Sequence, residues 1–142
     1  MAVAIKRVYD APSAQDGARV LVDRLWPRGL TKESAALHSW LKEVAPSDEL
    51  RKWYHAHTEQ WQVFRERYLK ELSSNEAAAA LQQLYDLRNA RKRLTLLFAS
   101  RNLERNNATV LKQLLEGDRK PPASTGPLRA GARKRARAAA RR

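Results

Sequence analysis

Residues 18–25 read Ala18-Arg-Val-Leu-Val-Asp-Arg-Leu25, and residues 94–99 read Leu94-Thr-Leu-Leu-Phe-Ala99. Both runs are short and almost continuously aliphatic or β-branched, which is typical of strands buried on both faces of a mainly parallel sheet. The alternating stretch Ile5–Tyr9 predicts a third strand at an edge of that sheet. These runs place the chain in the α/β class.

Helical periodicity takes over between the two aliphatic runs. Ser47 is suited to cap a helix over Asp48–His55, and Thr58 and Asn75 are suited to begin the next two helices. A last helix is expected from about Asn106 to Gly117. We therefore predict a single small domain over residues 1–117, with a mainly parallel sheet flanked by helices.

The C-terminal segment has a different composition. Residues 118–142 contain nine Lys or Arg and one Asp, a charge of +8, whereas the other 117 residues carry +5 of the total of +13. With one Leu and no aromatic residue, this segment cannot bury enough apolar surface to fold, so a disordered, basic, low-complexity tail is expected. Its predicted contacts with nucleic-acid phosphates are Arg129, Arg133, Lys134, Arg135, Arg137, Arg141 and Arg142.

Composition also excludes several classes of protein. The 142 residues include no Cys, which removes disulfide scaffolds, Cys-ligated metal centres and thiolate nucleophiles. No apolar run reaches the roughly 18 residues of a membrane span, and the first residues lack a signal-peptide core. A cytoplasmic protein without membrane contact is expected, and its oligomeric state is left open.

Polar residues follow both predicted central strands. In parallel α/β sheets, ligands bind beyond the carboxyl ends of the strands. The first strand delivers Asp23, Arg24 and Arg28 to that edge, and the second delivers Arg101 and Asn102, followed by Asn106 and Asn107 at a helix start. Guanidinium groups and a helix N-terminus favour a phosphate or carboxylate, so these residues form a candidate anion site.

A structural interpretation of the same residues stays open. Arg24 is next to Asp23 and could form an ion pair, and Trp26-Pro27 could close a turn. If the site were catalytic, Asp23 would be the candidate general base, although no recognised catalytic motif supports an enzyme.

Several longer strings carry a resemblance. Leu21-Val-Asp-Arg-Leu-Trp-Pro-Arg-Gly29, Trp40-Leu-Lys-Glu-Val-Ala-Pro-Ser47 and Thr95-Leu-Leu-Phe-Ala-Ser-Arg101 resemble the short, YeaO-like branch of the bacterial DUF488 family over about residues 3–116. The resemblance implies a compact α/β domain of the bacterial cytosol and little about activity. Longer relatives carry a Cys-His-Arg-like string after the last strand, where this chain has residues 101–107, so thiol chemistry is not expected here.

Other patterns are weaker. His55-Ala-His57 lacks a third ligand nearby, so no metal or cofactor is expected, and Ser100 lacks a nucleophile elbow. The simplest interpretation of six aromatic residues is that they belong to the hydrophobic core, and a base-stacking platform is the alternative. These residues are Trp40, Trp53, Tyr54, Trp61, Phe64 and Tyr68. The leading hypothesis is a small α/β protein that binds an anionic small molecule or nucleotide, and the alternative is a nucleic-acid-associated protein that binds DNA or RNA non-specifically through its tail.

Overall fold

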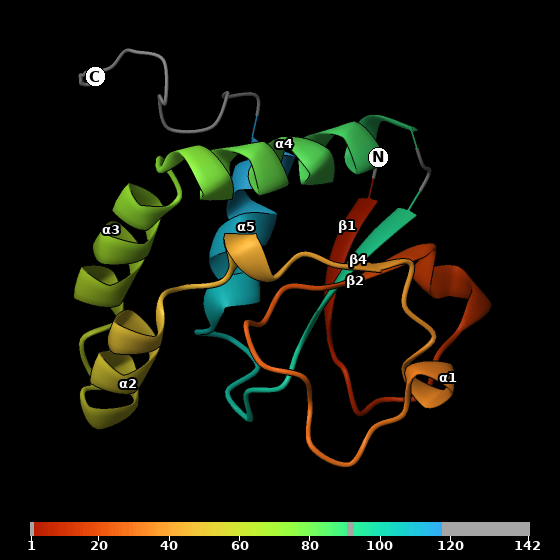
Figure 1. Ribbon diagram of the computed structural model, residues 1–142, viewed down its shortest axis with the longest axis horizontal. Coiled ribbons are helices and arrows are strands. Elements are labelled where there is room, and N and C mark those ends of the chain that lie inside the picture. Colours follow the sequence, from red (N-terminus) through yellow and green to blue (C-terminus); the bar gives the residue numbers. More distant parts are fainter. Residues whose placement is uncertain (1, 91–92, 118–142) are drawn as a thin grey trace.

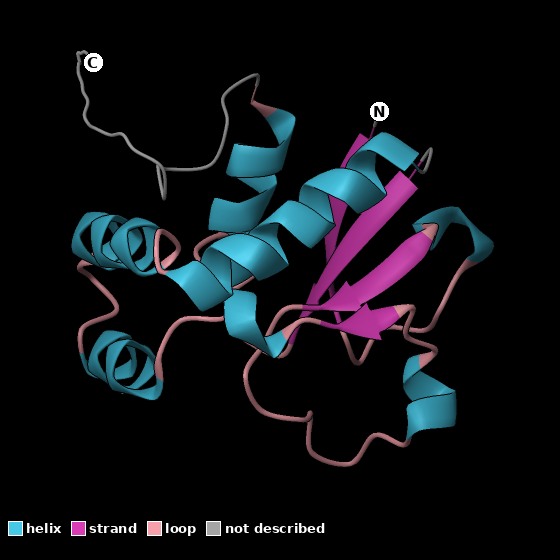
Figure 2. Ribbon diagram, turned by 45° about the horizontal axis from the view of Figure 1, so that its top comes forward, coloured by secondary structure: helices cyan, strands magenta, loops and turns pink. Residues whose placement is uncertain are grey.

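The computed structural model describes residues 2–90 and 93–117. The basic tail at 118–142, with its expected disorder and its seven nucleic-acid contact residues, lies outside the described residues. Four strands form one sheet in the order β1-β4-β2-β3, and every pairing is parallel (Figures 1 and 2). The strands are β1 (Ala2–Arg7), β2 (Ala18–Leu21), β3 (Ser39–Trp40) and β4 (Arg93–Phe98). The predicted α/β class and parallel sheet are confirmed.

The two central strands lie in the two aliphatic runs, but β2 ends at Leu21 rather than at Leu25, and β4 covers Arg93–Phe98 rather than Leu94–Ala99. β4 lies between β1 and β2, with Val20 opposite Leu96 and Leu21 opposite Leu97. Residues 18–22 and 94–98 are all buried, because both faces of the sheet are covered. The third predicted strand is at the edge, as expected, but it spans Ala2–Arg7 rather than Ile5–Tyr9.

Among the described residues, helices α4 (Asn75–Ala90) and α5 (Asn107–Glu116) cover one face of the sheet, and two further helices extend this layer beyond its edge. These two are α2 (Asp48–Ala56) and α3 (Trp61–Glu71). α5 packs against β1 and β4, α4 packs against β4 and α5, and α2 and α3 lie side by side away from the strands (Figure 1). This layer holds the main core, which includes Val20, Leu96, Phe98, Leu84 and Leu111.

The other face of the sheet is covered mainly by irregular chain. Leu21 and Leu97 pack there against Trp26, Leu30 and Trp40. In the described chain, the short helix α1 (Lys32–Ala35) belongs to this part. The 3₁₀ helix Ala14–Asp16 packs against β4, whereas the 3₁₀ helix Lys42–Val44 packs against α4 on the helix side. The sheet is therefore flanked by full-length helices on one face only.

Helix starts follow their caps. Ser47 accepts the Leu50 N–H at 3.1 Å and starts α2 as predicted, and Asn106 accepts the Thr109 N–H at 3.0 Å at the start of α5. Thr58 is not a cap, because α3 begins at Trp61 after Gln60. For α4, Ser74 rather than Asn75 accepts the first N–H groups.

A buried ion pair, joined by Lys6 of β1, fixes the segment before β2. Asp16 Oδ2 lies 2.6 Å from Arg19 Nη1 and 3.1 Å from Lys6 Nζ. The Arg19 Nε and Nη2 groups donate to Ala35 O, and Thr95 Oγ1 donates to Asp16 O. Because these groups satisfy one another, they fix the segment before β2 against β1, β4 and α1.

No helix within residues 2–90 and 93–117 has both the length and the apolar character needed to cross a membrane.

Candidate anion-binding site

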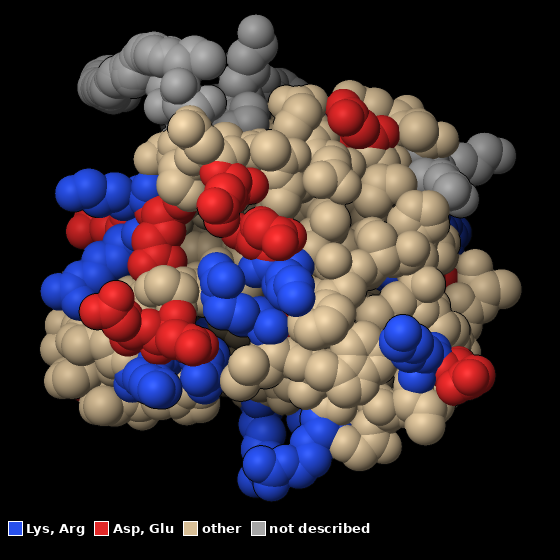
Figure 3. All heavy atoms as spheres, in the orientation of Figure 1, with Lys and Arg blue, Asp and Glu red and all other residues tan. Residues whose placement is uncertain are grey.

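A cleft of about 620 Å³ lies beyond the carboxyl ends of β2 and β4. Because the two strands are adjacent and parallel, residues 23–28 and residues 99–107 reach the same edge. All seven residues predicted for the site line this cleft: Asp23, Arg24, Arg28, Arg101, Asn102, Asn106 and Asn107. In the space-filling view, Lys and Arg atoms project from the lower edge of the molecule, where the segments after the strands lie in Figure 1 (Figure 3).

Asp23 is the one acidic residue among the described cleft residues, and both of its carboxylate oxygens are engaged. Oδ2 accepts the Ala99 N–H at 2.8 Å, and Oδ1 accepts the Asn107 amide Nδ2 at 3.1 Å. Burial raises the pKa of Asp23, while these hydrogen bonds and the charge of Arg51 offset part of that rise. The carboxylate therefore joins β2, β4 and α5.

Arg24 is fixed by backbone carbonyls rather than by an acid. Its Nε donates to Pro46 O at 3.2 Å and its Nη2 donates to Ala45 O at 3.2 Å. Within residues 2–90 and 93–117, no carboxylate lies within salt-bridge distance of Arg24. The ion-pair interpretation of Arg24 is wrong, and two backbone carbonyls hold its guanidinium at the cleft.

The three predicted asparagines shape the loop and the helix start. Asn102 Oδ1 accepts the Glu104 and Arg105 N–H groups, and Asn106 Nδ2 donates to Asn102 O at 2.7 Å. Asn107 Nδ2 also donates to Val22 O at 2.9 Å. These amides hold residues 99–107 in place beside the cleft, and their hydrogen bonds are largely satisfied within the chain.

Arg28 and Arg101 are exposed side chains of the cleft. No hydrogen bond or salt bridge uses either guanidinium within the described parts of the chain, and Arg28 is anchored only through its carbonyl, which accepts the Tyr9 hydroxyl at 3.0 Å. Trp26 Nε1 donates to Leu30 O at 2.8 Å, which closes the segment that carries Arg28. Both arginines are therefore free to meet a ligand.

One wall of the cleft was not predicted from the sequence. Helix α2 and the turn after it contribute Arg51, Tyr54, His55 and Thr58, and the loop before α5 contributes Arg105. The three α2 positions, Arg51, Tyr54 and His55, follow the i, i+3, i+4 spacing of a single helix face. That spacing is visible in the sequence, but a polar stripe of this kind is normally interpreted as a solvated surface.

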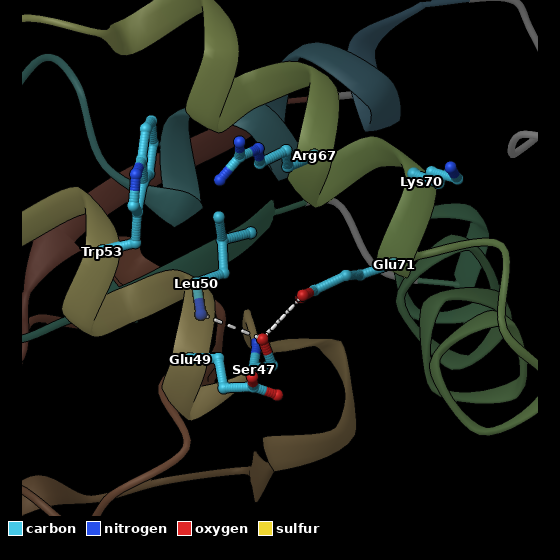
Figure 4. Close-up of a pocket in the computed structure, with 7 residues that line it drawn as sticks. All are labelled: Ser47, Glu49, Leu50, Trp53, Arg67, Lys70 and Glu71. Carbon is cyan, nitrogen blue, oxygen red and sulfur yellow. Dashed lines mark hydrogen bonds between the residues drawn. The ribbon is translucent and has the colours of Figure 1, made fainter. Parts of the chain in front are cut away.

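The beginning of α2 is set by a second, smaller network. The Ser47 N–H and Oγ donate to the Glu71 carboxylate at 2.8 and 2.6 Å, and Arg67 stacks over the Trp53 ring at 4.4 Å (Figure 4). These groups line a cavity of about 560 Å³ between α2 and α3. The hydrogen bonds between Ser47 and Glu71 join the start of α2 to the end of α3, and they thereby orient the helix that forms the cleft wall.

The six aromatic residues singled out in the sequence lie in different parts of the fold. Tyr54 and Phe64 line the cleft, whereas Trp53 faces the α2–α3 cavity and Trp40 packs on the opposite face of the sheet. Tyr68 is fully buried and donates to Val44 O. Trp61 is partly buried and packs on Phe64 at 5.7 Å between ring centroids. A continuous six-residue platform does not exist, but two of these rings are at the cleft.

The two histidines near α2 do not share a site. His55 lines the cleft, whereas the His57 ring stacks on Trp53 and its Nδ1 lies 2.8 Å from Trp53 O. Across residues 2–90 and 93–117, no group of three or more His, Asp or Glu side chains could hold a metal ion.

The chain is similar to several known bacterial proteins. Residues 2–126 match a family described as "Inactive DUF488-N3 subclade". The uncharacterized protein YeaO of Escherichia coli K12 is 46% identical over 116 residues, which cover 81% of this chain and 97% of that protein. An uncharacterized protein of Mycobacterium tuberculosis H37Rv is 44% identical over 115 residues, which cover 81% and 94% of the two chains. No solved structure matches.

Proposed function

The chain belongs to the DUF488-N3 family, in the subclade described as inactive, and on that premise we propose that its cleft binds a small anionic ligand without transforming it. The observation that carries the proposal is the surplus of arginine. Three separate segments contribute five guanidinium groups to one cleft, against the single carboxylate of Asp23; they are Arg24, Arg28, Arg51, Arg101 and Arg105.

The arginines are poorly compensated by acids. Among the described residues, Arg51 alone of the five forms a salt bridge, with Asp48 at 3.4 Å, and its Nε is buried without a hydrogen-bond partner. A buried unpaired donor is costly, and clustered guanidinium groups repel one another. An oxyanion would relieve both effects, because guanidinium groups bind phosphate and carboxylate oxygens through paired N–H groups.

Binding without catalysis is favoured by the state of Asp23. A general base needs a free carboxylate oxygen within reach of the proton that it removes. Each oxygen of Asp23 accepts one structural hydrogen bond, from the Ala99 N–H or the Asn107 amide. Each oxygen keeps a second lone pair, but these bonds fix the carboxylate as a link between β2, β4 and α5. The description of the subclade as inactive supports the same conclusion. The cytoplasmic location expected from the sequence stays a prediction.

Thermal unfolding with pyrophosphate at constant ionic strength tests the proposal. A ligand that binds only the folded chain raises stability by about 2.7 kcal/mol at one hundred times its Kd. We expect the melting temperature to rise with pyrophosphate, and Arg101→Gln to remove that rise with little change in the unliganded value. Arg65→Gln removes the same charge on α3, where Arg65 donates to Gln113 rather than to the cleft, and should keep the rise. An equal rise in both variants would reject the cleft as the site.

A second candidate function rests on the tail. Nine basic residues and one acid in residues 118–142 favour non-specific contact with the phosphates of DNA or RNA. Such contact neutralises phosphates without reading base sequence, so the tail would supply affinity and the cleft would be free for a separate ligand.

A further inference from the structure

The cleft has an aromatic and apolar wall as well as its arginines. Tyr54 and Phe64 line one side of the cleft. Leu25 and Trp26, in the segment after β2, also line it. Leu25 is 57% exposed and adds apolar surface at this edge of the cleft. A free phosphate ion would leave this carbon surface in contact with water, so the surface indicates a ligand with an apolar body.

Tyr54 is held in a fixed orientation. Its ring stacks on Phe64 with 4.2 Å between centroids and 19° between planes, and its hydroxyl donates to Arg105 O at 3.3 Å. Phe64 is itself 2% exposed and cannot move away. A planar ring that binds here therefore meets an ordered aromatic surface, and the Tyr54 ring does not have to be ordered at the moment of binding.

The aromatic and cationic groups lie on one helix face. Arg51 and Tyr54 are three residues apart on α2, which separates them by about 4.5 Å along the helix axis. His55 follows on the same face. A ligand that contacts both Arg51 and Tyr54 must carry its negative charge next to a ring.

The charge of the cleft sets the charge of the ligand. Five arginines and one carboxylate give the described cleft residues a net charge of +4 when His55 is neutral. A ligand with three or four negative charges matches this value, whereas a monoanion does not. The volume of the cleft, about 620 Å³, is also within the usual range for small-molecule sites.

We infer that the ligand of the cleft is a nucleoside di- or triphosphate, with its base against the Tyr54 side and its phosphates among the arginines. The inference rests on the proposed anion-binding function and names the class of ligand. It differs from the stacking platform considered from the sequence, because one ordered ring pair and a cationic loop replace a row of aromatic residues.

Isothermal titration calorimetry of the full chain with three probes tests the inference. Pyrophosphate is the anionic part of the ligand, adenosine is the ring part, and ADP joins the two. Since stacking of one base changes affinity by about ten-fold or more, we expect ADP to bind at least about ten-fold tighter than pyrophosphate. Adenosine should bind much more weakly than ADP. Tyr54→Leu should remove most of the ADP advantage, and Tyr54→Phe, which keeps the ring, should retain it.

The outcomes separate the two proposals. Equal affinity for ADP and pyrophosphate in the unmodified chain, with both lost in Arg101→Gln, would overturn the nucleotide inference and leave the anion site. Adenosine binding as tightly as ADP would also overturn it. Binding of ADP and pyrophosphate that is unchanged in Arg101→Gln would reject the anion site and the nucleotide inference together. None of these comparisons depends on the folding of the Tyr54 variants.

Discussion

The Asn107 amide nitrogen donates to Asp23 Oδ1 at 3.1 Å and to Val22 O at 2.9 Å, although 84 positions separate Asp23 from Asn107 in the chain. The other oxygen of Asp23 accepts the Ala99 N–H. One carboxylate thus connects the end of β2, the end of β4 and the first residue of α5. This connection holds together the segments that form the side of the cleft at the carboxyl ends of β2 and β4.

The pH dependence of stability should report on Asp23. Burial raises its pKa, so the folded state holds this proton more tightly than the unfolded state does. Its contribution to the free energy of unfolding is therefore present at low pH and is lost as pH rises from about 3.8 through the pKa of the folded state. Urea unfolding from pH 4 to 7 should show the stability of the unmodified chain falling relative to Asp23→Asn. A difference that does not change with pH would contradict this account.

The buried pair Asp16–Arg19 should be the most sensitive polar contact of the described fold. Burial alone raises the pKa of Asp16, but hydrogen bonds from Arg19 and Lys6 bring the pKa below its ordinary value. Asp16→Asn leaves the charge of Arg19, whose side chain is 5% exposed, without its counter-ion. We expect a loss of about 3–5 kcal/mol in urea unfolding. Glu116→Gln, which breaks an exposed pair with Lys112, should cost less than about 1 kcal/mol, and equal losses would refute the distinction.

The Tyr68 hydroxyl should stabilise the segment that holds Arg24. It is fully buried and donates to Val44 O, directly before the two carbonyls that accept from Arg24. Tyr68→Phe leaves that carbonyl buried without its donor, which should lower the free energy of unfolding by about 1–3 kcal/mol. Tyr9→Phe removes an exposed hydroxyl and should change stability by about 0.5 kcal/mol or less. Unfolding curves that do not separate the two variants would show that the buried bond contributes nothing.

The basic tail should dominate binding to DNA and RNA. Most of the excess charge lies after Gly117, so a chain that ends there should keep its melting temperature and lose most of its affinity for duplex DNA. If the tail neutralises about five to eight phosphates, the slope of log K against log salt for the full chain should be roughly −5 to −7. Fluorescence anisotropy over a salt series measures both. Equal binding by the shorter chain would move the nucleic-acid site into the domain.

Sequence patterns predicted the strands because aliphatic runs are local signals. Residues 18–25 and 94–99 indicated the two central strands, and the parallel arrangement then placed Arg24 and Arg101 at one edge. β3 contains only Ser39 and Trp40 and is too short to give a periodic signal. It pairs with β2 because the chain returns along that edge.

The cleft was only half predictable for a similar reason. The side formed by residues 23–28 and 99–107 follows from strand order, which the sequence indicates. The side formed by α2 depends on how Glu71, at the end of α3, holds Ser47 at the start of α2. Such a contact between distant helices has no local signature, so Arg51 and Tyr54 could not be assigned to the site from their spacing alone.

A titration of the isotopically labelled full chain with pyrophosphate, followed by ¹H–¹⁵N NMR, tests the anion site most directly. We expect saturable shifts at the backbone amides of Arg101, Asn106 and Asn107 and at the Nε–H of Arg51, with the same apparent Kd at each. Shifts confined to residues 118–142, with those four groups unchanged at saturation, would contradict this expectation.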